Sequence, residues 1–142
     1  MVFVLLFCQQ VQAQLMADPA HSYVVIVGVC EWKGELTKFS KKHRKDAELQ
    51  AYFKKAGVPS ANITALYDAS ATLKNMNKAL ANAGSKAAAK STIVFYYAGH
   101  GLSVADNIYF ANYDVDTEKT STAFNLDQIH KVLSRSKARN II

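Results

Sequence analysis

The sequence predicts an α/β fold in which helices cover both faces of a mostly parallel sheet. Residues 23–29 and 92–97 are continuous runs of mainly β-branched and aromatic residues, and continuity without alternation is typical of strands covered on both faces. The stretches between such runs carry apolar residues at helical spacing, so strands and helices alternate along the chain. With 142 residues, half of them apolar, the chain suits one compact domain rather than two.

The first strand is expected at residues 23–29, and a polar loop over residues 30–38 follows it. A helix over residues 40–56 comes next, because its apolar residues fall on one helical face. That face consists of Leu49, Tyr52, Phe53 and Ala56. Gly57 favours a helix end at this point, and Pro59 lies just beyond it.

A second strand is expected at residues 63–67. Thr72 can cap the helix after it, since a threonine hydroxyl accepts a hydrogen bond from a free backbone N–H of the first turn. The apolar stripe of that helix consists of Leu73, Met76, Leu80, Ala83 and Ala87. The crossover connections between parallel strands should be right-handed.

The third strand, residues 92–97, runs directly into Ala98-Gly99-His100-Gly101, and residues 108–110 predict another short extended piece. Asn125 with Gln128 resembles a capping box at the start of a third helix. The first apolar residues of this helix are Leu126, Ile129 and Leu133. Residues 139–142 resemble the opening of a further strand, so we expect the sheet to be incomplete at the C-terminus of this sequence.

The formal net charge of the sequence is +6, which could indicate an anionic partner. The lysines are scattered, however, and the one dense basic run is residues 41–45. No aromatic residues are interleaved with this run for base stacking. A solvated helix face is therefore the favoured interpretation, and we expect no nucleic-acid partner.

Residues 1–14 predict a signal peptide. Residues 2–7 form a short apolar run, and Val11 and Ala13 place small residues at the two positions that signal peptidase reads. Cleavage would make the mature protein secreted or periplasmic. The alternative is that Met16 is the true start, in which case the protein would be cytoplasmic. No other stretch is long enough to span a membrane, so no membrane association is expected after cleavage.

His100 is the strongest candidate for chemistry. In an open parallel sheet, functional groups collect at the carboxyl ends of the strands, and His100 directly follows the third strand. Gly99 and Gly101 on either side let the backbone turn sharply and leave the imidazole exposed. A histidine in this place can act as a general base, because its pKa lies near neutrality. On spacing alone, a loop residue without a catalytic role remains the alternative.

The segment Phe95-Tyr96-Tyr97-Ala98-Gly99-His100-Gly101 resembles the histidine motif of caspases and metacaspases. Further segments that resemble this family are residues 23–29, Asp46-Ala47 followed by Gly57, Leu66-Tyr67-Asp68 followed by Ala71-Thr72, and residues 109–114. The resemblance implies a caspase-like domain over residues 22–142, with three layers and helices on both faces of the sheet.

The resemblance also implies a cysteine endopeptidase that acts on polypeptides through a cysteine–histidine dyad. A thiol is only slightly ionised at neutral pH, so a nearby imidazole raises the share of thiolate and later protonates the leaving amine. His100 matches that base, and Gly101 matches the residue whose backbone N–H stabilises the oxyanion. Asp46 matches an acid of the first specificity pocket, which implies a preference for lysine or arginine before the scissile bond. The alternative for Asp46 is a surface helix acid beside Arg44 and Lys45.

The nucleophile of the family should follow the next strand, in a pattern such as Asp-x-Cys-x-Gly, and this sequence ends at Ile142 within that strand. Cys8 lies in the predicted signal peptide, and a small buried cysteine is the favoured interpretation of Cys30. We therefore expect this chain alone to be an inactive, partial domain that needs the C-terminal part of its own fold. The alternatives are a pseudo-peptidase that serves as a protein-interaction module and an unrelated α/β binding domain.

Asp114 and Asp116 carry a weaker indication of calcium, because some metacaspases bind calcium through aspartates in comparable loops. Calcium takes six to eight oxygen ligands, and a turn followed by solvated acids is the favoured interpretation. The sequence has no zinc-type spacing and no glycine motif for phosphates or dinucleotides. We therefore assign no metal site and no cofactor.

Overall fold

The computed structural model describes residues 18–42 and 44–142. The predicted signal peptide over residues 1–14, together with Cys8, lies outside the described residues, as do Met16 and His43. The described part nevertheless contains every strand and helix that the sequence analysis predicted.

The central sheet has four parallel strands in the order β2-β1-β3-β7. Their bounds are β1 Ser22–Gly28, β2 Ile63–Tyr67, β3 Thr92–Ala98 and β7 Asn140–Ile141. Strand β1 lies in the middle, so that Val24 is opposite Ile63 on one side and Val94 on the other. The predicted parallel sheet is thus confirmed, and the carboxyl ends of β1, β2 and β3 meet at one edge.

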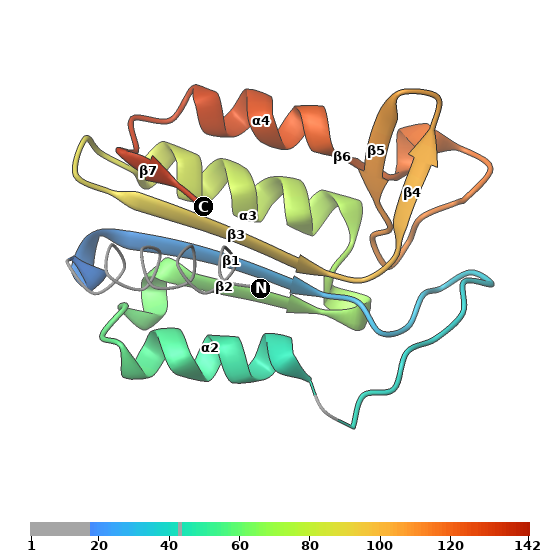
Figure 1. The fold of residues 1–142 in the computed structure, drawn as a ribbon, viewed down its shortest axis with the longest axis horizontal. Coiled ribbons are helices and arrows are strands. Elements are labelled where there is room, and N and C mark those ends of the chain that lie inside the picture. Colours follow the sequence, from blue (N-terminus) through green and yellow to red (C-terminus); the bar gives the residue numbers. More distant parts are fainter. Residues whose placement is uncertain (1–17, 43) are drawn as a thin grey trace, which may run out of the picture.

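Helices cover both faces of this sheet, as the sequence predicted. Helix α2 (Lys45–Lys55) lies on one face, and α3 (Leu73–Lys86) and α4 (Leu126–Ser134) lie on the other (Figure 1). Short 3₁₀ turns occur at Pro19–His21, Ser60–Asn62, Asp68–Ser70 and Thr120–Thr122. Among the helices of residues 18–42 and 44–142, none combines the length and apolar character needed to cross a membrane.

The two faces of β1 serve two separate hydrophobic cores. Val25 and Val27 pack on the side of α3 and α4, whereas Val24 and Ile26 pack on the side of α2. All four valine and isoleucine side chains are at most 1% exposed. Successive side chains of a strand point to opposite faces, so this double burial explains why β1 is apolar without alternation.

Helix α2 begins later than the sequence predicted. We expected a start at Ser40, but the helix begins at Lys45, and Arg44 before it adopts an extended conformation with φ −75° and ψ 95°. The side chain of Arg44 is bound to Asp46 and Asp68, and these ion pairs hold the backbone of Arg44 outside the helix. The interpretation of the basic run as a solvated helix face is therefore wrong for Arg44.

The caps of α3 and α4 follow the predicted residues. The Thr72 hydroxyl accepts a hydrogen bond from the Asn75 N–H at 3.2 Å, which confirms the cap of α3. Asn125 caps α4, but its side chain accepts from the N–H of Asp127 at 2.7 Å rather than from that of Gln128. Asn125 therefore caps the helix through an Asx turn and not through the predicted capping box.

A second, antiparallel sheet lies beyond the C-terminal end of β3. It consists of β4 (Gly101–Val104), β5 (Asn107–Phe110) and β6 (Phe124–Asn125), in the order β4-β5-β6. The sequence analysis expected only one extended piece here, at residues 108–110. The hairpin escaped notice because its turn is Ala105-Asp106, without the glycine that marks most two-residue turns. Ala105 accordingly has a left-handed backbone, with φ +50°.

Replacing Ala105 with glycine should stabilise the protein by about 1 kcal/mol, because glycine adopts positive φ without the clash that a Cβ causes. The free energy of unfolding in urea measures this effect. Ala51→Gly is a matched control, since Ala51 is an exposed residue within α2 and glycine should cost about 1 kcal/mol there. If both substitutions changed the free energy of unfolding in the same direction, the assignment of strain at Ala105 would be contradicted.

Candidate active site

His100 lies at the edge where the main sheet meets the hairpin. It follows β3 and directly precedes β4. The neighbouring strand β1 is joined to this point by a hydrogen bond from Val29 N to Ala98 O of 2.8 Å. The hairpin is joined to His100 itself by a hydrogen bond of 2.9 Å from Ala111 N to His100 O. The main chain of His100 is thus held from two directions.

The imidazole of His100 forms a cluster with two aromatic rings from the loop after β1. The ring centroid lies 4.6 Å from that of Trp32 and 4.3 Å from that of Phe39. Trp32 is 4% exposed and donates from Nε1 to Ala111 O at 2.8 Å. Phe39 is 44% exposed, and its ring also contacts that of Trp32, with 5.6 Å between the centroids. The loop that the sequence analysis interpreted only as polar therefore fixes the plane of the ring.

One nitrogen of His100 is committed to this loop. Nε2 lies 2.8 Å from the carbonyl oxygen of Thr37. A carbonyl can only accept a hydrogen bond, so Nε2 carries the proton, and in the neutral ring Nδ1 has a free lone pair. The described residues provide no hydrogen-bond partner for Nδ1. Nδ1 is therefore the nitrogen with which His100 can take a proton from a reacting group.

This tautomer can be measured on the chain as it stands. In long-range ¹⁵N–¹H spectra at about pH 8, above the ordinary pKa of histidine, His100 should show a protonated Nε2 and a bare Nδ1. His21 is the internal control, since its Nδ1 lies 2.8 Å from both carboxylate oxygens of Asp18 and should carry the proton. The same tautomer at both histidines would contradict the described geometry.

A half-buried tyrosine holds the carbonyl of His100. The Tyr97 hydroxyl lies 2.9 Å from His100 O and 3.0 Å from Ala111 O, and it donates to them. Burial raises the pKa of Tyr97, although the hydrogen bond to Ala111 opposes the rise, so the hydroxyl keeps its proton. A Cβ on Gly99 would overlap the Tyr97 hydroxyl, which explains the glycine before His100. The sequence analysis assigned Tyr97 to strand packing and missed this contact.

Tyr97→Phe should therefore lower the free energy of unfolding by about 1–2 kcal/mol, because it leaves buried carbonyl oxygens with one donor fewer. The neighbouring substitution Tyr96→Phe is the control, since no hydrogen bond of the Tyr96 hydroxyl occurs within the described chain. Urea unfolding of both variants tests the difference. A loss at Tyr96 as large as that at Tyr97 would contradict the role given to the Tyr97 hydroxyl.

The backbone N–H of Gly101 is free of the hairpin ladder. Gly101 lies opposite Phe110, and the bond from Ala111 N to His100 O makes this pair a non-hydrogen-bonded one. The N–H therefore points away from β5, at the open edge of β4. A Cβ on Gly101 would have nothing within 4 Å, so the residue leaves open space in front of that N–H.

Asp46 lies at the same edge of the sheet but is not the surface acid that the alternative interpretation expected. Its side chain is 4% exposed, and both carboxylate oxygens accept from Arg44 at 2.7–3.2 Å. Gly28, the last residue of β1, makes room for this pair, since a Cβ there would overlap the Asp46 carboxylate. The structure does not place Asp46 in contact with His100. The carboxylate is instead bound to a cation of its own chain.

Asp68 is the second acid of this cluster, and the sequence analysis did not assign it a role. Its Oδ2 lies 2.6 Å from Nη1 of Arg44 and 3.2 Å from Nζ of Lys41. Burial would raise the pKa of Asp68. The Cys30 N–H and the cations of Lys41 and Arg44 outweigh burial and hold this pKa below its usual value. Asp68 is therefore a carboxylate at neutral pH.

Cys30 does not form a dyad with His100. Burial raises the pKa of its thiol, Arg44 opposes that rise, and Asp68 and Asp46 add to it. The thiol is thus protonated at neutral pH, and the charged groups that act on it belong to the Arg44 cluster. Within the described residues, no hydrogen bond joins the side chains of Cys30 and His100. Cys30 is only partly buried, so the expectation of a buried cysteine is wrong in that respect. The raised pKa of its thiol still does not favour a nucleophile.

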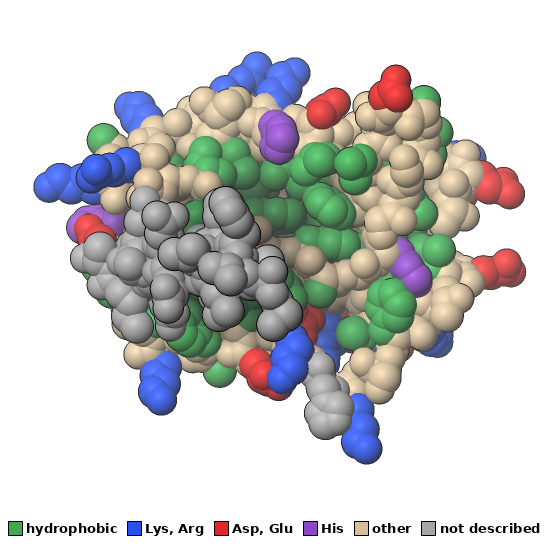
Figure 2. Space-filling model, viewed as in Figure 1, with side chains coloured by type: hydrophobic (Ala, Val, Ile, Leu, Met, Phe, Trp, Pro, Cys, Tyr) green, Lys and Arg blue, Asp and Glu red, His purple; other side chains and the backbone are tan. Residues whose placement is uncertain are grey.

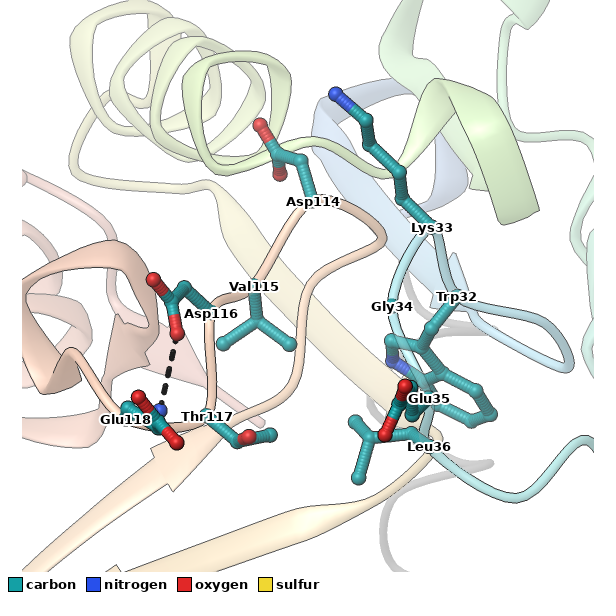
Figure 3. A pocket seen from close by; sticks show the side chains of 10 residues that line it. All are labelled: Trp32, Lys33, Gly34, Glu35, Leu36, Asp114, Val115, Asp116, Thr117 and Glu118. Atoms are coloured by element: carbon teal, nitrogen blue, oxygen red, sulfur yellow. Dashed lines mark hydrogen bonds between the residues drawn. The ribbon is translucent and has the colours of Figure 1, made fainter.

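Asp114 and Asp116 border a cavity of about 440 Å³ next to Trp32 (Figure 3). The cavity is lined by Trp32, Lys33, Gly34, Glu35, Leu36, Asp114, Val115, Asp116, Thr117 and Glu118. The two carboxylates point in different directions (Figure 3). Asp114 accepts from Leu73 N at 2.9 Å, at the start of α3, and Asp116 accepts from Glu118 N at 3.1 Å. Both acids thus stabilise local backbone, and residues 18–42 and 44–142 contain no group of three or more histidine, cysteine or acidic side chains suited to a metal.

His100, Gly101 and Asp46 were candidates from the sequence, whereas the residues that hold them in place were not. A sequence signal existed for Arg44, which lies two residues before Asp46 and carries the opposite charge. No such signal existed for Thr37, because it acts through a backbone oxygen. Phe39 also gave none, because its role depends on how the loop folds back over His100.

Comparisons with known proteins agree with this architecture. The family model described as the caspase domain matches residues 9–142. A structural-genomics crystal structure of a protein from Geobacter sulfurreducens matches with a TM-score of 0.65 and 16% sequence identity. The match covers 84% of this chain and 47% of that protein, so this chain spans about half of its length. At this identity the likeness shows the fold alone, and no curated protein matches the sequence. The family match over nearly the whole sequence shows that the chain belongs to the caspase-domain family.

Proposed function

We propose that this chain forms part of the catalytic domain of a cysteine-type endopeptidase in which His100 is the general base. The observation that carries the proposal is the bond from Nε2 of His100 to Thr37 O at 2.8 Å, in a chain of the caspase-domain family. That bond fixes the tautomer and leaves Nδ1 free at the carboxyl edge of a parallel sheet, where substrates bind in such folds.

The proposed nucleophile is a cysteine on a strand that continues β7 along β3. In the observed register, Thr92 is opposite Asn140 and Ile93 is opposite Ile141, a constant offset of 48 residues. His100 lies seven residues after Ile93, so a strand continuing past Ile141 in this register comes level with His100 about seven residues later. A thiol on that strand would lie at the same edge as Nδ1.

The surface along β3 supports an added strand at this place. The last described bond between the two strands joins Phe95 N to Ile142 O at 2.9 Å, and β3 itself runs on to Ala98. Hydrophobic side chains gather on the viewed face between α4 and β3, past β7 (Figure 2). Phe95 and Tyr97 on β3 are only half-buried. A strand laid here would cover apolar surface and pair a free sheet edge.

The proposed reaction is hydrolysis of a peptide bond. Nδ1 of His100 takes the thiol proton, and the thiolate attacks the carbonyl carbon of the scissile bond. The Gly101 N–H donates to the oxyanion that forms. The imidazolium then protonates the leaving amine, and an acyl-enzyme remains. Water, deprotonated by the same imidazole, hydrolyses the thioester and restores the thiol.

A preference for lysine or arginine before the scissile bond is a finer part of the proposal, and it rests on the carboxylate of Asp46. This carboxylate is 4% exposed and already bound to Arg44. The preference therefore requires Asp46 to accept a cation from outside its own chain. Export through cleavage of residues 1–14 is a separate proposal that rests on the sequence pattern alone, and sequencing the N-terminus of the mature protein tests it.

The test is a cleavage assay on the polypeptide that the complete gene encodes. Fluorogenic peptides with arginine, lysine, citrulline or aspartate before the scissile bond are incubated with the protein, before and after treatment with iodoacetamide. The proposal predicts cleavage that alkylation abolishes. A folded product that cleaves none of these peptides would contradict the proposal and favour a protein-interaction module. Cleavage that survives alkylation would contradict the thiol mechanism.

A further inference from the structure

The guanidinium of Arg44 is enclosed by groups that accept hydrogen bonds. Nε donates to the Asp46 carboxylate at 3.1 Å, Nη1 to Asp68 Oδ2 at 2.6 Å, and Nη2 to Asp46 Oδ2 and to Gly28 O, both at 2.7 Å. The guanidinium carbon also lies 4.8 Å from the centre of the Tyr67 ring. Two carboxylates, a carbonyl and an aromatic face together match the donors and the flat cationic surface of a guanidinium.

Three separate parts of the fold build this receptor. Gly28 O comes from the end of β1, Asp68 and Tyr67 from the end of β2, and Asp46 from the first turn of α2. The two acids are largely buried, with 4% of the Asp46 side chain and 13% of the Asp68 side chain exposed. The receptor therefore depends on the ends of β1 and β2 and on the first turn of α2.

Arg44 lies outside the helix and strands that supply the groups around it. It precedes the first turn of α2 in an extended conformation, without a capping hydrogen bond from its side chain to that turn. Its side chain is 17% exposed, so it closes the receptor on the solvent side. Removing this side chain opens a route from solvent to two carboxylates, with Lys41 as the remaining cation bound to Asp68.

We propose that Arg44 is an internal ligand that blocks an arginine-binding site built by Asp46, Asp68, Gly28 and Tyr67. A basic side chain of another polypeptide can enter only when the side chain of Arg44 leaves. Because Arg44 is tethered beside the site, its effective concentration is high, and a free arginine competes poorly with it. Arg44 is thus the residue that decides whether this edge of the sheet accepts a cation.

The consequence for substrate choice rests on the proposed peptidase function. With Arg44 in place, the preference for arginine over its uncharged analogue citrulline before the scissile bond should be smaller than the open site would give. Removing Arg44 should raise the ratio of kcat/KM for the arginine peptide over the citrulline peptide by about tenfold or more, since each tenfold change corresponds to a single charge-assisted contact.

The direct test is a binding measurement that needs no peptidase activity. N-acetyl-L-arginine amide is titrated into ¹⁵N-labelled wild-type chain, Arg44→Ala and the double variant Arg44→Ala/Asp46→Asn, and N-acetyl-citrulline amide serves as the neutral control. We expect Arg44→Ala to bind the arginine probe at least about tenfold more tightly than the wild type. The double variant and the citrulline probe should show no binding at millimolar concentration.

Equal affinity of wild type and Arg44→Ala for the arginine probe would overturn the proposal, as would a folded Arg44→Ala that binds no probe. If Arg44→Ala is unfolded, methylguanidinium is added at millimolar concentration, and the native spectrum is recorded to see whether it returns. Methylammonium at the same concentration is the control. Recovery with methylguanidinium supports the receptor, and no recovery overturns it. Binding by a chain whose complete gene product cleaves no peptide would leave the receptor intact while the proposed function fails.

Discussion

His100→Ala in the polypeptide encoded by the complete gene is expected to lower kcat/KM for peptide cleavage by about 10³-fold, because general base and acid catalysis by a placed side chain contributes about 10²–10⁴-fold. The substitution removes the nitrogen that activates the thiol and the proton that the leaving amine needs. Steady-state hydrolysis of the best fluorogenic peptide measures the loss. The free energy of unfolding of the same variant shows whether the loss reflects chemistry or misfolding.

The control for this prediction is His130→Ala. His130 lies on α4 and is exposed, and its ring makes no described contact with the edge that carries His100. Its removal should change kcat/KM by less than about twofold, as expected for an exposed position away from the site. A His100→Ala variant that stays folded and retains more than about a tenth of the wild-type activity would contradict the role of His100, since it would leave general base catalysis almost no share in the rate.

Gly28→Ala should lower the free energy of unfolding by about 3 kcal/mol or more. A Cβ at this position would overlap the Asp46 carboxylate and lie 2.9 Å from Nη2 of Arg44. The ion pair must move to make room, and disrupting a buried ion pair costs about 3–5 kcal/mol. Urea unfolding followed by circular dichroism measures the effect.

Gly34→Ala is the matched control for Gly28→Ala, because its new Cβ would meet only Val115 O, at 3.8 Å. Its effect should stay within about 0.5 kcal/mol, as for most surface substitutions. If Gly28→Ala were as mild as Gly34→Ala, the tight packing of Asp46 and Arg44 against the end of β1 would be wrong.

The sheet and its helices could be predicted because the pattern of apolar residues within each segment indicates which of its faces are buried. The continuous apolar runs of β1 and β3 required cover on both faces, and the structure provides it through α2 on one side and α3 with α4 on the other. The position of His100 followed from the same pattern, since it comes directly after β3. Thr72 likewise indicated the start of α3, because the residue that it caps, Asn75, is only three positions further along the chain.

The sequence could not predict features that depend on contacts between distant segments. The hairpin after His100 was missed because Ala105 occupies a turn position that usually holds glycine. The late start of α2 depends on Arg44 reaching Asp68, which lies 24 residues away. The tautomer of His100 depends on Thr37 O, 63 residues earlier, and any residue type could supply that oxygen.

For Asp46 the sequence indicated a candidate residue but not that its carboxylate is buried and paired with Arg44. The resemblance to caspases and metacaspases implied that this carboxylate lines a pocket for a basic substrate side chain, whereas the structure shows it bound to Arg44. The two residues are close in sequence, yet an exposed helix face was the favoured interpretation of Arg44 and the alternative for Asp46. Their burial becomes evident only with Gly28 and Asp68 in place around them.

The central claim, that His100 activates a thiol, is tested most directly by the pH dependence of thiol alkylation. The polypeptide of the complete gene and its His100→Ala variant are treated with iodoacetamide between about pH 5 and pH 10, both with Cys8→Ser and Cys30→Ser to remove the background thiols of residues 1–142. An unperturbed cysteine has a pKa of about 8.5. The account predicts a cysteine that reacts with an apparent pKa below about 7 in the parent and near 8.5 in the His100→Ala variant, since the imidazolium stabilises the thiolate. Identical profiles, or no cysteine that reacts below about pH 8, would contradict it.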